Sequence, residues 1–229
     1  PANGKVITTV VSTPMIDVVA PAKNVGVIKT LTGFKYIGEK IRQFENKEID
    51  GTYILGFEES YGYLIGTHAR DKDAIVSSLL IAEMAAFYNS KGTSIYKELQ
   101  KLYQEFGYYL EGIKSVTLTG KDGIEKMANL MTELRETVKD RTIDKNIKIK
   151  RDFKTKKELI VATGEEKDIL LPVENVIQFV LEDDTYITAR PSGTEPKIKF
   201  YFSVNAPTKE EVEKKLNETM EKFVATLKL

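Results

Sequence analysis

The first half of this chain alternates between two apolar patterns, one typical of buried β-strands and the other of amphipathic helices. Continuous apolar runs of the strand type cover residues 5–11, 25–28 and 52–55. Segments with helical spacing or helix caps cover residues 15–22, 34–44, from Asp71 or Asp73 to Gly92, and 95–106. Because strands that alternate with helices build layered α/β folds, this half is predicted to be an α/β domain.

The pattern starts again near Gly112, where we expect a domain boundary that divides the chain into residues 1–112 and 113–229. Beyond it, strands are predicted at 115–118, 176–181, 186–189 and 197–204, and helices at 122–138 and from Thr208 onward. The second domain is therefore predicted to be a smaller α+β domain in which helices flank a sheet.

The chain has no overall charge that would select a partner. Its 229 residues include 34 Lys plus Arg and 34 Asp plus Glu, so any anion site has to be local. Residues 139–157 hold nine Lys or Arg against three Asp. Because Phe153 is the only aromatic residue among them, this stretch favours a solvated loop or an edge hairpin over a nucleic-acid patch.

Two further features concern the origin of the chain. Cysteine is absent, and no signal-peptide pattern or apolar run of 18 residues occurs, which favours a cytoplasmic location and argues against a membrane partner. The chain opens at Pro1 without an initiator Met, and a buried strand follows almost at once. We therefore expect it to be a fragment of a longer protein.

The segment Arg190-Pro191-Ser192-Gly193-Thr194 lies between two predicted strands and has the composition of a phosphate-binding turn. The Arg190 guanidinium can bind two phosphate oxygens, and the hydroxyls of Ser192 and Thr194 can donate to others. Gly193 lets backbone N–H groups approach an anion closely. The same residue types are common in ordinary turns between strands, so composition alone leaves both interpretations open.

A second polar segment follows the strand at residues 52–55. Glu58, Glu59 and Ser60 could hydrogen-bond to sugar hydroxyls, because loops at strand ends often carry such groups. The alternative is a solvated turn closed by Gly62.

Three more side chains are candidates by position. Lys35 and Lys72 lie at or near predicted helix starts and could reach a phosphate or sugar oxygen, although lysines in such places usually face water. His68 is the only histidine and could act as a general base or cap the next helix. The sequence contains no Asp-x-Asp-x-Asp cluster for Mg²⁺ and no Walker loop, and it offers no catalytic nucleophile and no metal ligands.

Taken together, four ordered motifs resemble the last two domains of the α-D-phosphohexomutases, the phosphoglucomutase/phosphomannomutase family. The motifs are residues 32–36 (Thr-Gly-Phe-Lys-Tyr), 56–62 (Gly-Phe-Glu-Glu-Ser-Tyr-Gly), 68–73 (His-Ala-Arg-Asp-Lys-Asp) and 190–196 (Arg-Pro-Ser-Gly-Thr-Glu-Pro). The resemblance covers essentially the whole chain. It implies a sugar-binding α/β sandwich-type third domain at 1–112 and a phosphate-binding α+β fourth domain at 113–229.

The resemblance also implies an activity. The chain would be the C-terminal half of a four-domain isomerase of carbohydrate metabolism, an intramolecular phosphotransferase that works through a bisphosphorylated sugar. The phosphoserine nucleophile and the Mg²⁺ site would lie in the missing N-terminal domains, and a hexose bisphosphate would prime the full-length enzyme. The fragment alone would be inactive and would bind no cofactor itself.

Residue roles follow from the matched motifs in the same way. Glu58, Glu59 and Ser60 would hold sugar hydroxyls, and Lys35, Lys72 and His68 match positions at or near the active-site cleft. The phosphate that is not being transferred would be held by Arg190, Ser192, Gly193 and Thr194.

The sugar-binding motif bears on the substrate. Glu-Glu-Ser followed by an aromatic residue and Gly resembles the glucose-preferring phosphoglucomutases, so we expect glucose phosphate as the substrate. Phe57 and the continuation Tyr61-Gly62-Tyr63 depart from the family patterns, which keeps a phosphomannomutase or phosphopentomutase open. A free-standing module that binds a phosphorylated ligand or a nucleic acid is the alternative from a different class.

Overall fold

A computed structural model describes residues 1, 3–118, 120, 122–136 and 147–227. The chain forms two compact units, Pro1–Gly107 and Tyr108–Leu229. Gly107 ends a helix with φ +88°, and the first strand of the second unit begins at the next residue. The division thus falls five residues before the position expected from the sequence.

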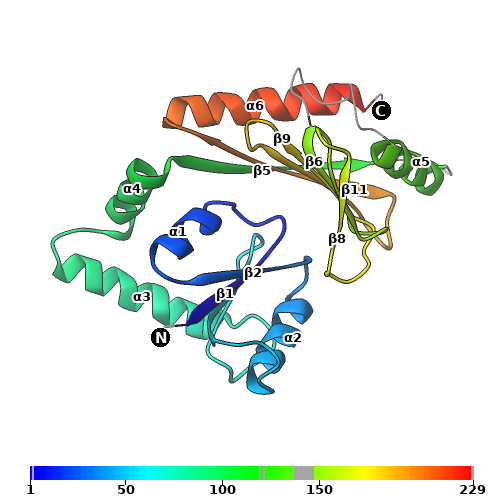
Figure 1. The fold of residues 1–229 in the computed structure, drawn as a ribbon. Helices are drawn as coiled ribbons and strands as arrows, with labels where there is room; N and C mark the ends of the chain where they lie inside the picture. The colour runs from blue at the N-terminus through cyan, green and yellow to red at the C-terminus, as the bar shows by residue number, and fades with distance from the viewer. Residues whose placement is uncertain (2, 119, 121, 137–146, 228–229) are drawn as a thin grey trace. The chain divides into compact units, whose positions relative to one another are not determined.

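The first unit is built on a four-stranded sheet in the order β2-β1-β3-β4 (Figure 1). Strands β1 (Gly4–Thr9), β2 (Gly26–Thr30) and β3 (Thr52–Glu58) are parallel, and β4 (Gly62–Ile65) returns antiparallel to β3. Sequence analysis missed β4 because its four residues are bounded by glycines and read as loop. Helices α1 (Ile16–Ala22) and α2 (Phe34–Glu45) connect the parallel strands.

Helix α2 has one apolar face, as its spacing predicted. Phe34, Ile37 and Ile41 are buried from that face in a core shared with Ile7 of β1 and Leu64 of β4. This packing fixes the start of α2 next to the ends of the parallel strands, where the candidate site lies.

Helices α3 (Ala74–Ser90) and α4 (Ile95–Phe106) complete the first unit. The Asp73 carboxylate caps α3 by accepting hydrogen bonds from the amides of Ile75 and Val76 at 2.9 and 3.0 Å. Helix α3 contains a single charged residue, Glu83, and several of its apolar side chains are exposed. No helix among the described residues is both long enough and apolar enough to span a membrane.

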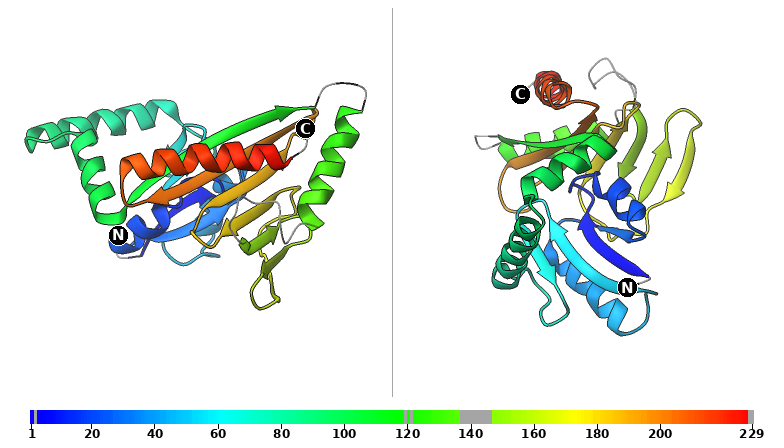
Figure 2. Two further views of the ribbon diagram at one scale, coloured as in Figure 1. Left: turned by 90° about the horizontal axis from the view of Figure 1, so that it is seen from above. Right: turned by 90° about the vertical axis from the view of Figure 1, so that its left-hand side faces the viewer.

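The second unit contains a seven-stranded antiparallel sheet in the order β5-β11-β10-β9-β6-β7-β8. The strands are β5 (Tyr108–Thr117), β6 (Ile147–Asp152), β7 (Lys157–Ile160), β8 (Glu165–Asp168), β9 (Ile177–Leu181), β10 (Tyr186–Pro191) and β11 (Lys197–Ala206). Helices α5 (Gly123–Glu136) and α6 (Lys209–Thr226) contribute to one core with the sheet, and α6 lies along β5 and β11 (Figure 2). The predicted sheet flanked by helices is therefore present.

The position of Gly112 explains why the boundary lies elsewhere. Gly112 is in the middle of β5, beneath α6, where an added Cβ would lie 2.6 Å from the Met220 sulfur. Glycine is needed here because the helix packs closely on the strand. In the sequence, such a glycine looks the same as a glycine of a linker.

The Lys-rich stretch forms part of the sheet where it is described. Residues 147–157 form β6, a turn and the start of β7, an antiparallel pair toward the edge of the sheet. Several of its cations are paired, with Lys148 bound to Asp184, Arg151 to Glu158 and Lys157 to Asp168. Residues 139–146 and the predicted end of the helix at 137–138 lie outside the described residues.

Candidate functional site

The carboxyl ends of the three parallel strands in the first unit lie at one edge of the sheet. β1 ends at Thr9, β2 at Thr30 and β3 at Glu58. In open α/β sheets this edge is where ligands bind, because the loops that follow the strands converge there. Hydrogen bonds join these loops to the predicted sugar-binding residues.

Glu58 is the last residue of β3, and its side chain is only 7% exposed. Its Oε1 atom accepts a hydrogen bond from the backbone N–H of Gly33, the N-cap of α2, at 2.6 Å. Burial raises the pKa of Glu58, and the Gly33 hydrogen bond partly offsets that rise. The other oxygen, Oε2, has no hydrogen-bond partner among the described residues and lies beside Gly62.

Glu59 points to a different loop. Its Oε2 atom accepts a hydrogen bond from the Thr9 hydroxyl at 2.8 Å, and the Ser12 hydroxyl lies 3.4 Å from the same oxygen. Oε1 has no hydrogen-bond partner within the described part of the chain. Each glutamate therefore has one oxygen held by a donor of the protein and one oxygen without such a donor among the described residues.

Ser60 and Tyr61 complete a three-residue turn between β3 and β4, in which Glu58 pairs with Gly62. Tyr61 has φ +60°, the left-handed conformation that this kind of hairpin uses at its third loop position, and its ring is 90% exposed. Ser60 is exposed at the tip. The predicted loop is thus a tight hairpin that projects beside the two carboxylates.

Lys72 lies next to this hairpin. An added Cβ on Gly62 would be 3.1 Å from the Lys72 side chain and 3.4 Å from Glu58 Oε2. The Lys72 ammonium is 5.7 Å from the centre of the Phe34 ring and 3.3 Å from an oxygen of Asp71. The charge of Lys72 also offsets part of the rise in the pKa of Glu58 that burial causes. Lys72 therefore belongs to the same constellation as Glu58.

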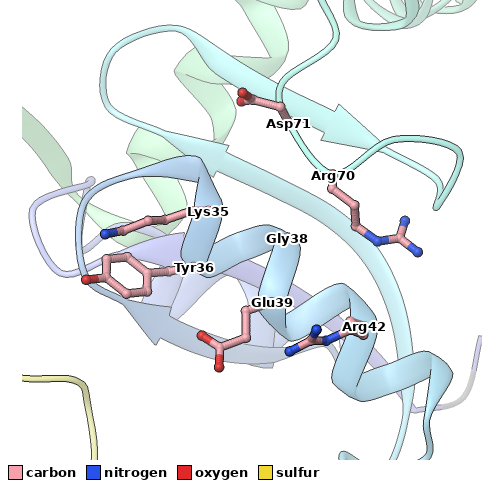
Figure 3. A pocket seen from close by; sticks show the side chains of 7 residues that line it. All are labelled: Lys35, Tyr36, Gly38, Glu39, Arg42, Arg70 and Asp71. Atoms are coloured by element: carbon pink, nitrogen blue, oxygen red, sulfur yellow. The ribbon is translucent and has the colours of Figure 1, made fainter.

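Lys35 lines a surface depression of about 610 Å³ between α2 and the loop at Arg70 and Asp71 (Figure 3). Its ammonium lies 4.6 Å from the centre of the Tyr36 ring. Figure 3 shows Lys35 and Tyr36 pointing to one side of the helix and Arg70 lying on the other side, so the polar groups do not converge. His68 is tied to the helix cap, with Nε2 2.9 Å from Asp73 Oδ2.

In the second unit, the residues predicted to bind phosphate form the connection between β10 and β11. The Ser192 Oγ atom accepts hydrogen bonds from the amides of Thr194 and Glu195 at 3.3 and 3.2 Å, which closes the turn. The Ser192 amide donates to the Lys197 carbonyl at 2.7 Å. The space beside Gly193 is open, because no atom lies within 4 Å of where its Cβ would be.

Arg190 leaves β10 on the sheet face opposite the core. Its neighbour Ala189 is in the core, and side chains of a strand alternate between faces. Arg190 is paired across the strands with Lys199 of β11, which is paired in turn with Ser115 of β5. Neither Arg190 nor Lys199 has a carboxylate in ion-pair distance among the described residues. Two unneutralised cations thus lie side by side next to the turn.

Comparison with known proteins now assigns the family. Residues 1–106 match the family model described as phosphoglucomutase/phosphomannomutase, alpha/beta/alpha domain III. A phosphoglucomutase of Staphylococcus aureus is 35% identical over 211 residues, and one of Staphylococcus haemolyticus is 33% identical over 212 residues. These alignments cover 92% and 93% of this chain, respectively. Residues 1–106 thus belong to the phosphoglucomutase/phosphomannomutase family, and the similarity to its members extends over nearly the whole chain.

Solved structures related to this family have the same fold. A Paramecium phosphoglucomutase, pp63/parafusin, aligns over 98% of this chain with a TM-score of 0.65 at 19% identity. A putative phosphomannomutase of Thermus thermophilus aligns over 98% with a TM-score of 0.57 at 18% identity. At these identities the likeness concerns the fold alone. The chain spans about 38% of the length of the curated relatives it matches and 37% of each of these two structures.

Sequence analysis gave no role to four residues that the structure places beside the predicted site residues, although one of them, Gly33, lies within the motif at residues 32–36. Thr9, Ser12 and Gly33 hydrogen-bond to the glutamates or to each other, and Lys199 faces Arg190. A signal for the first three was present, since Thr9 is near the end of one predicted strand, Ser12 follows that strand and Gly33 follows the next. Their pairing with the glutamates depended on the order of those strands, which the sequence pattern did not specify.

Proposed function

We propose that this chain provides the sugar-binding and phosphate-binding parts of a phosphoglucomutase, which interconverts glucose 1-phosphate and glucose 6-phosphate. The observation that carries the proposal is the pair of half-held carboxylates at the end of β3. Glu58 and Glu59 each keep one free oxygen, and carboxylate oxygens are strong acceptors for sugar hydroxyls. Ser60 at the hairpin tip would add a hydroxyl, and Lys72 beside Glu58 a cation.

The phosphate that is not being transferred would bind at the β10–β11 turn. Arg190 offers a bidentate fork, and Ser192, Thr194 and the open backbone at Gly193 offer further donors. Lys199 adds a second cation beside Arg190. A phosphate dianion there would neutralise two like charges that otherwise repel each other. His68 and Lys35 would have smaller roles, because His68 is hydrogen-bonded to the helix-capping Asp73 and the Lys35 ammonium packs against the Tyr36 ring.

Phosphoryl transfer itself would need groups beyond those described. Among the described residues, no group of three or more His, Cys, Asp or Glu is arranged to hold a metal ion, so we assign no metal-dependent step to them. We propose that a phosphoserine and an Mg²⁺ site belong to other domains of the same longer enzyme, where Mg²⁺ would neutralise charge on the transferring phosphoryl group. A hexose bisphosphate would prime that enzyme.

Substrate titration tests this proposal. Calorimetry or NMR titration of the chain with glucose 1-phosphate should detect binding that Arg190→Ala abolishes and that Lys214→Ala, on the exposed surface of α6, leaves unchanged. The same titration with mannose 1-phosphate and ribose 1-phosphate ranks the phosphomannomutase and phosphopentomutase alternatives. If mannose 1-phosphate or ribose 1-phosphate binds more tightly than glucose 1-phosphate, that sugar phosphate is the better candidate for the substrate.

Two outcomes would contradict the proposal as a whole. Robust metal-dependent turnover of glucose 1-phosphate by the chain alone, with glucose 1,6-bisphosphate added, would mean that a nucleophile has been overlooked in it. Tight binding of single-stranded RNA with a steep dependence on salt would favour a nucleic-acid module instead. We expect neither, because several cations of the Lys-rich stretch are already paired with carboxylates.

A further inference from the structure

Thr9 is the last residue of β1 and Ser12 lies in the tight turn that follows it, and neither belongs to a motif that predicted the site. Both are buried, with 0% and 5% of their surface exposed. Their hydroxyl oxygens are 2.9 Å apart, and both approach the same oxygen of Glu59. They come from a segment 47 to 50 residues away from that glutamate.

The hydrogen bonds around Thr9 give its hydroxyl a direction. Its Oγ1 atom accepts from the backbone N–H of Ser12 at 3.1 Å and, more weakly, from that of Val11 at 3.3 Å. Because a hydroxyl has two lone pairs and one proton, these contacts leave the proton for an acceptor on the other side. That acceptor is Glu59 Oε2, at 2.8 Å. With both lone pairs of Thr9 Oγ1 in use, the Ser12 hydroxyl donates to the same carboxylate oxygen, from which it lies 3.4 Å.

We infer that Thr9 and Ser12 are positioning residues that hold the Glu59 carboxylate in the orientation in which its free oxygen accepts a hydroxyl of the bound sugar. This inference rests on the proposed function for its ligand. A glutamate side chain loses considerable rotational freedom when it binds, and a side chain that is already ordered avoids that cost. The two hydroxyls would fix Glu59 before the ligand arrives, so they would act through Glu59 and touch no ligand themselves.

The chain offers a closely matched control one residue away. Thr8 is also a buried threonine of β1, but its Oγ1 atom has no hydrogen-bond partner in the part of the chain that the structure describes. Thr8→Val and Thr9→Val therefore make the same chemical change at adjacent buried positions, and only the second removes a donor to Glu59. Thr9→Ser retains the hydroxyl and should restore the function if the hydroxyl is what matters.

The experiment compares glucose 1-phosphate with inorganic phosphate as ligands of the chain. Thr9→Val should weaken glucose 1-phosphate binding about three- to tenfold, the range expected from ordering one free side chain. It should leave inorganic phosphate affinity unchanged, because the proposed phosphate site is in the second unit. Thr8→Val should match the parent, and Thr9→Ser should return to within about twofold of it. If Thr9→Val merely disturbed the fold, we would not expect phosphate affinity to stay unchanged and Thr9→Ser to restore glucose 1-phosphate binding.

Equal glucose 1-phosphate affinities for Thr9→Val and Thr8→Val would overturn the inference. If the parent binds glucose 1-phosphate no better than inorganic phosphate, the proposed sugar site itself fails, which is a different result. In that case a crystal structure of the Thr9→Val/Ser12→Ala chain decides the positioning role without a ligand. A Glu59 carboxylate that moves away from its place supports the role, and one that stays in place refutes it.

Discussion

Replacing Arg190 by methionine is expected to weaken phosphate binding and, at the same time, to stabilise the second unit. Arg190 and Lys199 are directly opposite each other in the β10–β11 ladder, and no carboxylate among the described residues neutralises either. Like charges in opposite positions of a sheet destabilise it. Methionine keeps most of the apolar stem of Arg190 and removes only the charged fork, so the change separates charge from packing.

The two effects differ in size as well as sign. Two charges about 7 Å apart in water repel each other by about 0.6 kcal/mol, so removing one should stabilise the fold by roughly 0.5 kcal/mol. Hydrogen bonds to charged groups contribute about 1.5–3 kcal/mol each, so losing a bidentate contact should weaken phosphate binding by at least about 3 kcal/mol, or more than about 100-fold. Function should therefore suffer far more than the fold gains.

Urea unfolding followed through the NMR signals of β10 and β11 amides measures the stability of this unit, and calorimetry measures phosphate affinity. The gain in stability should disappear in about 1 M salt, where the Debye length is about 3 Å. Lys199→Met should give a similar gain in stability. The double variant should add little to it, because either single substitution already removes the repulsion between the two charges. A loss of stability in Arg190→Met, or a gain that salt does not change, would refute the reasoning.

Two further predictions concern the first unit. Burial raises the pKa of Glu58, so the folded chain retains a proton that the unfolded chain releases, and stability should fall as pH rises above the ordinary value of 4.5. Glu58→Gln should therefore stabilise this unit at pH 7 but not at pH 4 in thermal unfolding, and an equal effect at both values would contradict the assignment. At Gly38 an added Cβ would lie 2.5 Å from the Arg70 carbonyl oxygen. Gly38→Ala should cost about 1–3 kcal/mol of overpacking, which exceeds the roughly 1 kcal/mol gained in helix propensity, whereas Glu39→Ala on the exposed face should be nearly neutral in the same assay.

The elements that the sequence predicted well have a strong internal pattern. Helix α2 has an apolar stripe that repeats at helical spacing, and the first half of β11 alternates buried Ile198 and Phe200 with the more exposed Lys197 and Lys199. Such patterns arise when one face of an element is buried and the other is not, so local sequence suffices to detect them.

The missed strands lack such a pattern. β8 consists of four charged residues that are all exposed, and it is held by pairing with β7 instead of by packing. The first half of β5, from Tyr108 to Gly112, lies outside the strand predicted at residues 115–118, because the strand pattern becomes recognisable only after Gly112. Edge strands and close helix–strand contacts are determined by neighbours that are distant in the sequence, so local composition gave no reliable signal for them.

In the candidate site, two adjacent residues show both what local sequence reveals and what only contacts between distant segments determine. Consecutive side chains at the end of a strand point to opposite sides, so Glu58 and Glu59 contact different neighbours, the start of α2 and the turn after β1. A motif with two glutamates therefore appears in the sequence as one acidic signal, although the fold holds each carboxylate separately. Burial raises the pKa of Glu58, so its ionised form is expected to destabilise the fold. The Glu59 carboxylate is instead hydrogen-bonded by the hydroxyls of Thr9 and Ser12, which the motif does not contain. The two glutamates are therefore not interchangeable, and substitutions at the surrounding residues should affect them independently.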